Sequence, residues 1–191
     1  KLWDTATLRV LANLGRHEDP IQSATFSPDG RWIVSRSYLQ ISLWDAQRAR
    51  FLGRSALPEG DFFTAHAVSH DGKWMAVGTY LGGVYYGAVG KDLELKKVGE
   101  HGARVRDLEF ARDNQFFVSA GDDRRIQVRK LSDPKEAATS EPSESPINWI
   151  EINPGGTQVL ATGIGGQAEV YDAATAKVQH RFEHVIGEKG T

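Results

Sequence analysis

Histidine is the side chain of this sequence best suited to metal binding or to acid–base chemistry near neutral pH. Six histidines are spread along the chain. His180 and His184 are four residues apart, a spacing that would align two metal ligands on a helix. In a β-strand the same two residues share a face but lie about 13 Å apart, too far to bind one ion. The chain has no cysteine, so thiolate ligands are excluded as well, and we expect no metal site.

Two glycine-rich segments raise the question of phosphate binding. Gly82-Gly83 and residues 163–166 are each followed by residues typical of a strand, whereas the phosphate loops of nucleotide-binding proteins lead into a helix. We interpret both segments as turns. Asp122-Asp123 is an acidic pair, but no set of nucleophile, base and orienting residue accompanies it. We therefore expect a protein that is not an enzyme and that needs no cofactor.

The bulk properties narrow the class of protein further. The chain has 191 residues, which is enough for one domain with a real core. Its net charge of -2 argues against a nucleic-acid-binding surface dominated by basic residues. No apolar run approaches the roughly 18 residues that span a membrane, so we expect no membrane partner. The absence of cysteine suits a reducing compartment and predicts a cytoplasmic location. Because the chain begins at Lys1 without Met, we expect its natural N-terminus to be missing.

The chain is internally repetitive, with a period of 42 residues. Tight-turn pairs recur at this spacing, at Asp29-Gly30, Asp71-Gly72, Asp113-Asn114 and Gly155-Gly156. Six columns of residues beside these turns keep the same period, and 22 of their 24 positions are apolar, against about 10 expected by chance. His66 is one of the two exceptions, and we expect it to face the core or a central channel. Four copies of one unit therefore follow one another along the chain.

Each unit has the pattern of four β-strands. Residues before the turn alternate between apolar and polar, whereas those after it, such as residues 32–34, are apolar on both faces. A strand with two apolar faces must be covered on both sides, as happens when sheets stack around an axis. A third strand follows at residues 41–45 and 126–128, and more polar fourth strands lie near residues 49–52 and 177–182. Four strands in 42 residues predict the blade of a β-propeller.

The same segments contain phrases that resemble those of WD-repeat proteins. The WD dipeptide and one conservative variant occur at Trp3-Asp4, Trp44-Asp45 and Tyr171-Asp172. Residues 26–30, FSPDG, resemble the phrase before the first hairpin turn of many WD repeats. By these phrases the chain is similar to the WD-repeat family over essentially its whole length, with degenerate repeats that look bacterial. The resemblance implies an all-β fold, a β-propeller of four-stranded blades.

The resemblance also implies a hydrogen-bonded chain of side chains that locks a blade. In the family this chain runs from a His before the inner strand, through a Ser or Thr on the second strand and an Asp in the next turn, to the Trp. Such a chain satisfies buried polar groups. Two repeats offer part of it, the first with His17, Ser35 and Trp44 and the second with His101, Ser119 and Asp123. The second has Arg129 where the Trp is expected, and the other two repeats lack the His, so the chain cannot stabilise every blade.

The repeats predict about 4.5 blades. Residues 1–15 form a half blade, since the chain begins in the third strand of a repeat. Full blades then cover about residues 16–57, 58–99, 100–141 and 142–183, and residues 184–191 begin the next repeat. A seven-bladed ring is usual in the family, so the resemblance implies an incomplete ring. We expect the missing blades to come from the same longer chain or from a second chain.

WD-repeat propellers bind proteins or peptides on the face that carries the loops before the inner strands and the turns between the second and third strands. The resemblance places six candidate contact residues there, namely Gln22, Phe62, Thr64, Arg104, Arg106 and Asp122. An exposed aromatic residue such as Phe62 suits a recognition hot spot. The basic residues near Arg104 are interpreted as a solvated surface, with an acidic or phosphate-bearing partner as the alternative. We expect a non-catalytic protein–protein interaction scaffold whose partner the sequence does not identify.

Two other functions stay open. The chain could be a sensor or oligomerisation module of a larger signalling protein, such as a kinase, a protease or an NTPase. A domain of that kind in the same polypeptide would decide for this alternative. The chain could also be an enzyme that uses the central channel, as hydrolase or quinoprotein propellers do. That reaction would need carboxylates, histidines or a metal near the axis, where this sequence places mainly apolar residues and His66.

Overall fold

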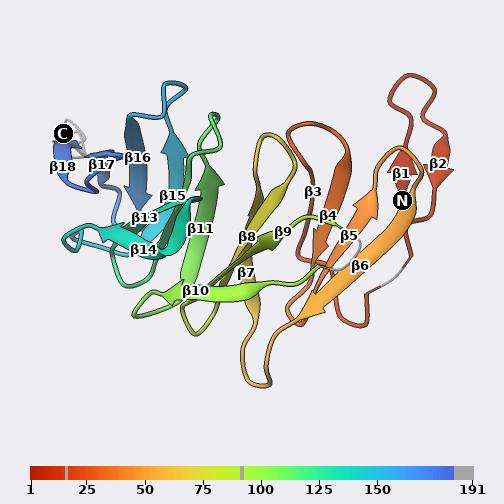
Figure 1. Cartoon of the computed structure of the whole chain (residues 1–191), viewed down its shortest axis with the longest axis horizontal. Helices are drawn as coiled ribbons and strands as arrows, with labels where there is room; N and C mark the ends of the chain where they lie inside the picture. The colour runs from red at the N-terminus through yellow and green to blue at the C-terminus, as the bar shows by residue number, and fades with distance from the viewer. Residues whose placement is uncertain (16, 91–92, 183–191) are drawn as a thin grey trace, which may run out of the picture.

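A computed structural model describes residues 1–15, 17–90 and 93–182 of the chain. These residues contain 18 β-strands and no α-helix. The strands form one two-stranded sheet and four four-stranded sheets, all antiparallel, which confirms the predicted all-β class. Figure 1 shows the sheets following one another in chain order, from the N-terminus on the right to the C-terminus on the left. The expected start of a further repeat, at residues 184–191, lies outside the described residues.

The strands within each sheet follow the order of the sequence. The two-stranded sheet consists of β1 (Leu2–Trp3) and β2 (Val10–Ala12). The first four-stranded sheet consists of β3 (Ser23–Phe26), β4 (Trp32–Arg36), β5 (Gln40–Asp45) and β6 (Arg50–Ala56). The second consists of β7 (Phe63–Val68), β8 (Trp74–Thr79), β9 (Gly83–Ala88) and β10 (Lys96–Glu100). The third consists of β11 (Val105–Phe110), β12 (Phe116–Gly121), β13 (Ile126–Lys130) and β14 (Asp133–Thr139), and the fourth of β15 (Ile147–Ile152), β16 (Gln158–Gly163), β17 (Ala168–Asp172) and β18 (Val178–Phe182).

The four predicted turns join the first and second strands of the four sheets. The second residue of each pair has a positive φ, at 72° for Gly30, 66° for Gly72, 56° for Asn114 and 67° for Gly156. Each of these residues also donates its backbone N–H to the carbonyl three residues earlier, at 2.9 Å. The period of the turn pairs therefore reflects one hairpin geometry built four times. These hairpins lie together along the upper edge of Figure 1, and we call this the hairpin face.

The first strand of each four-stranded sheet lies beside the first strand of the next sheet. Thr25 of β3 and His66 of β7 are hydrogen-bonded through Oγ1 and Nε2 at 2.8 Å. Strand β11 contacts both β7 and β15, and the backbone N–H of Ile150 donates to the Asp107 carboxylate at 2.9 Å. The sheets therefore meet along their first strands, which are the inner strands of the repeat, as the blades of a propeller do.

Three apolar clusters fill the spaces between neighbouring four-stranded sheets. Adjacent residues of one strand serve different clusters, because side chains alternate between the two faces of a strand. Phe117 of β12 packs with the second sheet, whereas Val118 packs with the fourth, and both side chains are fully buried. For the third sheet this confirms the prediction that the second strand of a repeat is covered on both sides, whereas in β16 of the fourth sheet Val159 is buried and Leu160 only partly so. The inner strand of the first sheet is less covered than the others. Phe26, at the end of this strand, and Ile21, just before it, are both exposed.

Candidate partner-binding face

The loops before the inner strands and the turns between the second and third strands lie on the side opposite the hairpin face. This side is the lower edge of Figure 1, and we call it the loop face. It contains the loop of residues 57–62 before β7 and the loop of residues 101–104 before β11. It also contains the turns at residues 37–39 and 80–82. It also contains Gln22, directly before β3, and Asp122, directly after β12. All six residues predicted to contact a partner therefore lie on or next to loops and turns of this face, but the structure gives them different environments.

His101, Ser119 and Asp123 are brought together in the third sheet. The Nδ1 atom of His101 lies 2.9 Å from a carboxylate oxygen of Asp123, and Nε2 lies 2.8 Å from the hydroxyl of Ser119. The side chain of His101 has no exposed area. A neutral imidazole satisfies both contacts when Nδ1–H donates to Asp123 and Nε2 accepts the hydroxyl proton of Ser119. Burial raises the pKa of Asp123, but the hydrogen bond from His101 and those from the backbone N–H groups of Gly102 and Arg125 outweigh burial and hold this pKa below its ordinary value.

His17, Ser35 and Trp44 are brought together in the first sheet. The hydroxyl of Ser35 lies 2.7 Å from Nε2 of His17 and accepts the indole N–H of Trp44 at 2.9 Å. Burial lowers the pKa of His17, although the charge of Asp19 acts in the opposite direction. The geometry of both predicted side-chain sets is therefore present, while their contribution to stability stays a prediction.

Strand pairing places Arg129 of the third sheet at the position that Trp44 holds in the first sheet. Trp44 pairs with Ile33, and in the third sheet Arg129 pairs with Phe117, which holds the position equivalent to Ile33. Arg129 takes no part in the hydrogen bonds of His101. Its guanidinium instead donates to the carbonyls of Val98, Pro134 and Lys135, at 3.1 to 3.2 Å. Arg129 thus joins β14 to the second sheet.

Arg106 and Asp122 form an ion pair with two hydrogen bonds. Nε of Arg106 donates to Asp122 at 2.6 Å, and Nη2 donates to the second carboxylate oxygen at 3.2 Å. About a quarter of each side chain is exposed, 27% for Arg106 and 26% for Asp122. The pair joins the start of the inner strand to the turn after β12, so these two charges already satisfy one another.

Thr64 and Gln22 hold equivalent positions in their repeats but have different surroundings. Thr64 is buried, and its hydroxyl donates to the carbonyl of Val105 at 2.6 Å. Thr64 is therefore not on the exposed surface where the sequence places it. Gln22 is exposed, and its amide donates to the carbonyl of Pro20 at 3.2 Å.

Phe62 lies at the centre of a row of three exposed aromatic side chains. Its ring centroid is 6.3 Å from that of Tyr38 and 6.4 Å from that of Tyr80, and both contacts are edge-to-face. Tyr38, Phe62 and Tyr80 are 46%, 39% and 53% exposed. We call these three residues the aromatic row. The sequence interpretation identified Phe62 but missed both tyrosines, although they occupy the same turn position 42 residues apart.

Two carboxylates fix the backbone beneath the aromatic row. Asp19 accepts the backbone N–H of Tyr38 at 2.9 Å. Asp61 accepts the N–H groups of Phe62 at 2.8 Å and of Leu81 at 3.0 Å. The row is therefore presented by loops that are held before any partner binds, which lowers the entropic cost of binding.

His66 occupies the inner strand of the second sheet, where the sequence predicts a core or channel-facing residue. It is half-buried and bonded to Thr25. Burial, with a smaller contribution from the charge of Arg36, lowers the pKa of His66 to about 4, so the imidazole is neutral at pH 7. Over the described residues, no group of three or more His, Cys, Asp or Glu side chains could hold a metal ion. The described chain also has no helix that is long and apolar enough to cross a membrane.

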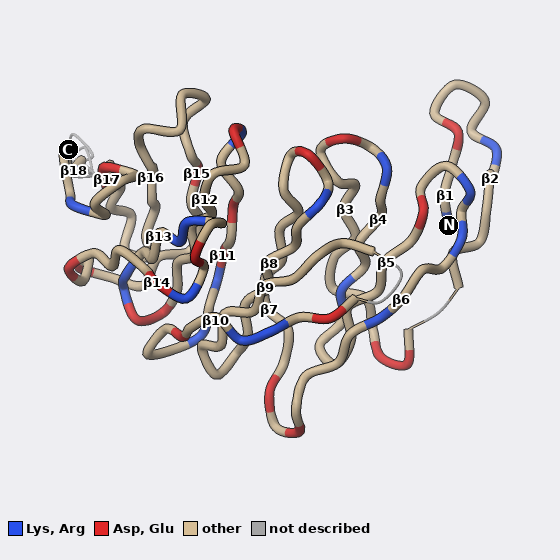
Figure 2. Tube along the Cα trace, in the orientation of Figure 1, with Lys and Arg blue, Asp and Glu red and all other residues tan. Residues whose placement is uncertain are grey.

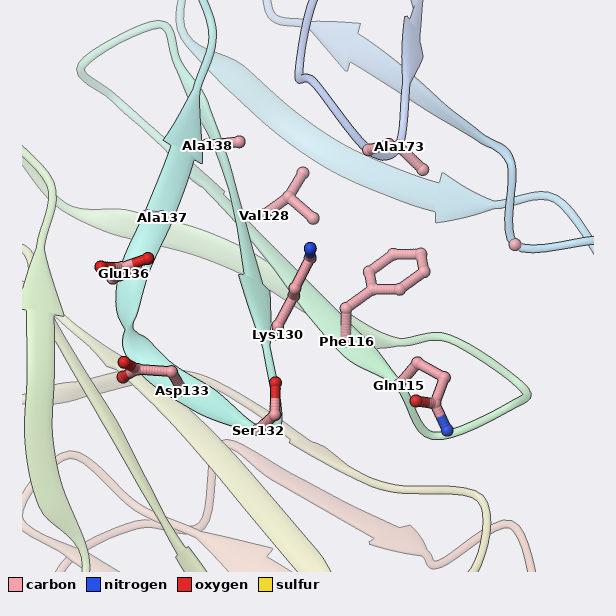
Figure 3. Close-up of a pocket in the computed structure, with 12 residues that line it drawn as sticks. Gln115, Phe116, Val128, Lys130, Ser132, Asp133, Glu136, Ala137, Ala138 and Ala173 are labelled. Carbon is pink, nitrogen blue, oxygen red and sulfur yellow. The ribbon is translucent and has the colours of Figure 1, made fainter.

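One cavity that opens to the surface lies elsewhere, between the third and fourth sheets. It has a volume of about 740 Å³ and opens near the hairpin face. Figure 3 shows Phe116 and Lys130 extending into it, with Asp133 and Glu136 along the strand that borders it. None of the six predicted contact residues lines this cavity. Figure 2 shows acidic and basic residues interspersed along the whole trace, with no region of a single sign.

Comparison with known proteins agrees with the repeat geometry. The family described as WD domain, G-beta repeat matches residues 8–45 and 93–129. Each matched region contains one of the two sets built around His17 and His101. The chain is a WD-repeat protein. Its four-stranded sheets correspond to the blades of the WD40 β-propeller.

Three similar proteins come from two fungi and a flatworm. Protein HIR1 of Candida albicans is 27% identical over 66% of this WD-repeat chain and 16% of its own length. Eukaryotic translation initiation factor 3 subunit I of Pyricularia oryzae is 24% identical over 96% of the chain and 57% of its own length. The WD repeat-containing protein SL1-17 of Schistosoma mansoni is 31% identical over 69% of the chain and 44% of its own length. The chain thus spans between 16% and 57% of these relatives.

Proposed function

We propose that this WD-repeat protein is a non-catalytic interaction scaffold that binds a protein or peptide partner on its loop face. The observation that carries the proposal is the aromatic row of Tyr38, Phe62 and Tyr80. Large apolar side chains are normally placed inside a protein, and a group of them on one exposed face is typical of a binding surface.

The surroundings of the row support this interpretation. Leu39 and Leu81, beside the two tyrosines, are 53% and 64% exposed, so the apolar surface extends beyond the three rings. Aromatic anchors on a prearranged backbone are the usual source of binding energy at protein interfaces. A partner that covers the row would remove this apolar area from water without having to order the loops that carry it.

The similar proteins support a role in assemblies. Besides the initiation factor subunit, polyadenylation factor subunit 2 of Candida albicans is 24% identical over 71% of this chain and 25% of its own length. Both printed names denote subunits of larger factors. The proposal takes from them only the general role of binding other proteins.

Affinity capture with quantitative mass spectrometry tests the proposal. Wild-type protein is immobilised beside the double variant Phe62→Ala/Tyr80→Ala and the control Phe182→Ala, which removes an exposed aromatic side chain of β18. Each captured candidate is then expressed alone and titrated against the purified chain. We expect a direct partner whose affinity falls at least about tenfold with the double variant and is kept by the control. Equal binding by the double variant would overturn the assignment of the loop face, and no direct partner at all would overturn the scaffold.

A further inference from the structure

Arg36 is the exception in its column of the repeat. The equivalent positions, 42 residues apart, hold the smaller residues Gly78, Ala120 and Thr162. Arg36 ends β4, is half-buried and donates from Nη1 to the carbonyl of Phe63 at 2.9 Å. This bond places the guanidinium beside the aromatic row. No described carboxylate lies within ion-pair distance of Arg36.

Arg104, immediately before β11, is a second arginine of the loop face that has no carboxylate partner. It is half-buried, and its side chain donates no hydrogen bond to a described residue. The Nε atoms of both Arg36 and Arg104 are buried without a partner among the described residues. Arg106, two positions further on, differs because Asp122 neutralises it. Of these three arginines, therefore, one is compensated and two are not.

Hydrogen bonds through the second sheet bring Arg36 close to Arg104. Arg36 donates to the carbonyl of Phe63, and the hydroxyl of the next residue, Thr64, donates to the carbonyl of Val105, which follows Arg104 directly. Burial lowers the pKa of Arg36, and the positive charge of Arg104 lowers it further. Among the described residues, no carboxylate forms an ion pair with either arginine. Two half-buried like charges are costly in a region of low polarisability. An anion that reached the terminal nitrogens of both guanidinium groups would recover that cost.

The chemistry of the anion follows from the donors and from what lies next to them. Each guanidinium offers planar N–H groups that match a carboxylate oxygen, and a carboxylate has two oxygens, one for each arginine. Phe62 directly precedes the residue whose carbonyl Arg36 binds, so the aromatic row borders the charged site. An occupant that fits both parts carries a single negative charge next to an apolar side chain.

We propose that the loop face recognises a peptide segment in which an Asp or Glu side chain lies beside an apolar one. The carboxylate binds between Arg36 and Arg104, and the apolar side chain covers the aromatic row. This inference rests on the proposed function and adds the chemistry by which the partner is recognised.

Selection from a displayed library of random dodecapeptides tests the inference. The purified chain is the target, and enriched peptides are labelled with fluorescein and titrated by anisotropy. We expect enriched sequences with an acidic residue next to an aromatic or aliphatic one. Replacing that acid by its amide should weaken binding at least about tenfold, as should the variant Arg36→Gln/Arg104→Gln. The matched control, Arg50→Gln/Arg112→Gln, makes the same change in net charge at exposed arginines near the hairpin face and should bind like the wild type.

The outcomes separate this inference from the scaffold itself. The carboxylate site is overturned by any of three results: enrichment of peptides without acidic residues, no enrichment at all, or unchanged binding by the arginine variant. Loss of captured partners with Phe62→Ala/Tyr80→Ala would still support the scaffold in each of these cases. A phosphoserine peptide that binds more than about tenfold tighter than its Glu counterpart would overturn the choice of carboxylate over phosphate. Arg104→Gln alone breaks no hydrogen bond to a described residue, so it tests the site even where loss of Arg36 weakens the fold. Its affinity should also fall, and wild-type affinity in a variant with unchanged thermal unfolding would count against the site.

Discussion

The imidazole of His101 lies 2.8 Å from the hydroxyl oxygen of Ser119, a residue 18 positions further along the chain. The bond spans the third sheet, from the loop before β11 to the middle of β12. Because the His101 side chain has no exposed area, its nitrogens cannot turn to water when a protein partner is lost. A buried polar group that loses its partner keeps the full cost of its desolvation.

The first prediction follows from this contact. Ser119→Ala should lower the free energy of unfolding by about 1–3 kcal/mol, because Nε2 of His101 would stay buried without a hydrogen bond. Urea unfolding followed by tryptophan fluorescence measures the change. The control is Ser132→Ala, at an exposed position after β13, which should change stability by less than about 0.5 kcal/mol. Equal effects of the two substitutions would show that the hydrogen-bonded chain does not stabilise the sheet.

The second prediction concerns pH and His66. Its pKa is about 4 in the folded chain, against an ordinary value of 6.5. Between these two values the unfolded chain binds a proton that the folded chain does not. The free energy of unfolding therefore falls as the pH is lowered from about 6.5 to about 4, and His66 has no such effect above this range.

The measurement compares the wild type with His66→Gln. From pH 7 to pH 4.5 the wild type should lose about 1–3 kcal/mol more than the variant in urea unfolding, with the partial exposure of the ring reducing the effect below its upper limit. Parallel loss of stability in the two proteins would mean that His66 is protonated as easily in the folded state as in the unfolded one.

Arg106 and Asp122 give the third prediction. Arg106→Glu would place two carboxylates at a contact that is now 2.6 Å long, and it should lower the free energy of unfolding by about 1 kcal/mol or more. The reversed pair Arg106→Glu/Asp122→Arg should recover at least half of this loss. A double-mutant cycle from thermal unfolding gives the coupling between the two side chains. Additive losses in the cycle would show that the ion pair contributes nothing to the fold.

The repeat pattern was enough to predict the architecture, because turns and strands depend on local requirements. Gly30 and Asn114 stand at positions that need a positive φ, and few residue types adopt it easily. Phe117 and Val118 point to opposite sides of one strand and both are apolar. Only a strand that is covered on both faces needs apolar residues on both sides. Requirements of this kind recur in every copy and are therefore visible in the sequence.

The contact face was harder to predict, because the direction of a side chain at the start of an inner strand depends on strand register. The pairing of β7 with β8 shifts between Phe63 and Ala65, and the pairing of β11 with β12 shifts between Val105 and Asp107. Thr64 and Arg106 are the residues at these two irregularities, and a bulge redirects its side chain. Thr64 points to a neighbouring carbonyl and Arg106 to a carboxylate, although their sequence positions are equivalent.

The proximity of Arg36 to Arg104 could not be predicted from the sequence, for a different reason. Arg36 ends a strand of the first sheet and Arg104 directly precedes the third. They are connected only through tertiary contacts of Phe63 and Thr64 in the second sheet. A period of 42 residues relates equivalent positions, whereas these two residues are not equivalent. The available signal was the departure of Arg36 from a column of smaller residues.

The fourth prediction concerns the close approach of the second and third sheets at Gly78. A Cβ atom on this residue of β8 would overlap the side chain of Val105 at the start of β11. Replacing Gly by Ala usually stabilises a chain by reducing the freedom of its unfolded state. Here the overlap should dominate, and Gly78→Ala should lower the free energy of unfolding by about 1–3 kcal/mol.

Two controls separate the overlap from a general effect of losing a glycine. Gly155→Ala adds a Cβ whose nearest neighbour is 3.9 Å away, in ordinary contact, and Asp29, Asp71 and Asp113 hold the same turn position in the other repeats. This variant should be as stable as the wild type or more stable. Val105→Ala leaves a small cavity and should be destabilising alone. Combined with Gly78→Ala it should cost less than the sum of the two, because the shorter side chain at position 105 makes room for the added Cβ, which in turn fills part of the cavity. Strict additivity in urea unfolding would show that the spacing between the two sheets does not depend on this contact.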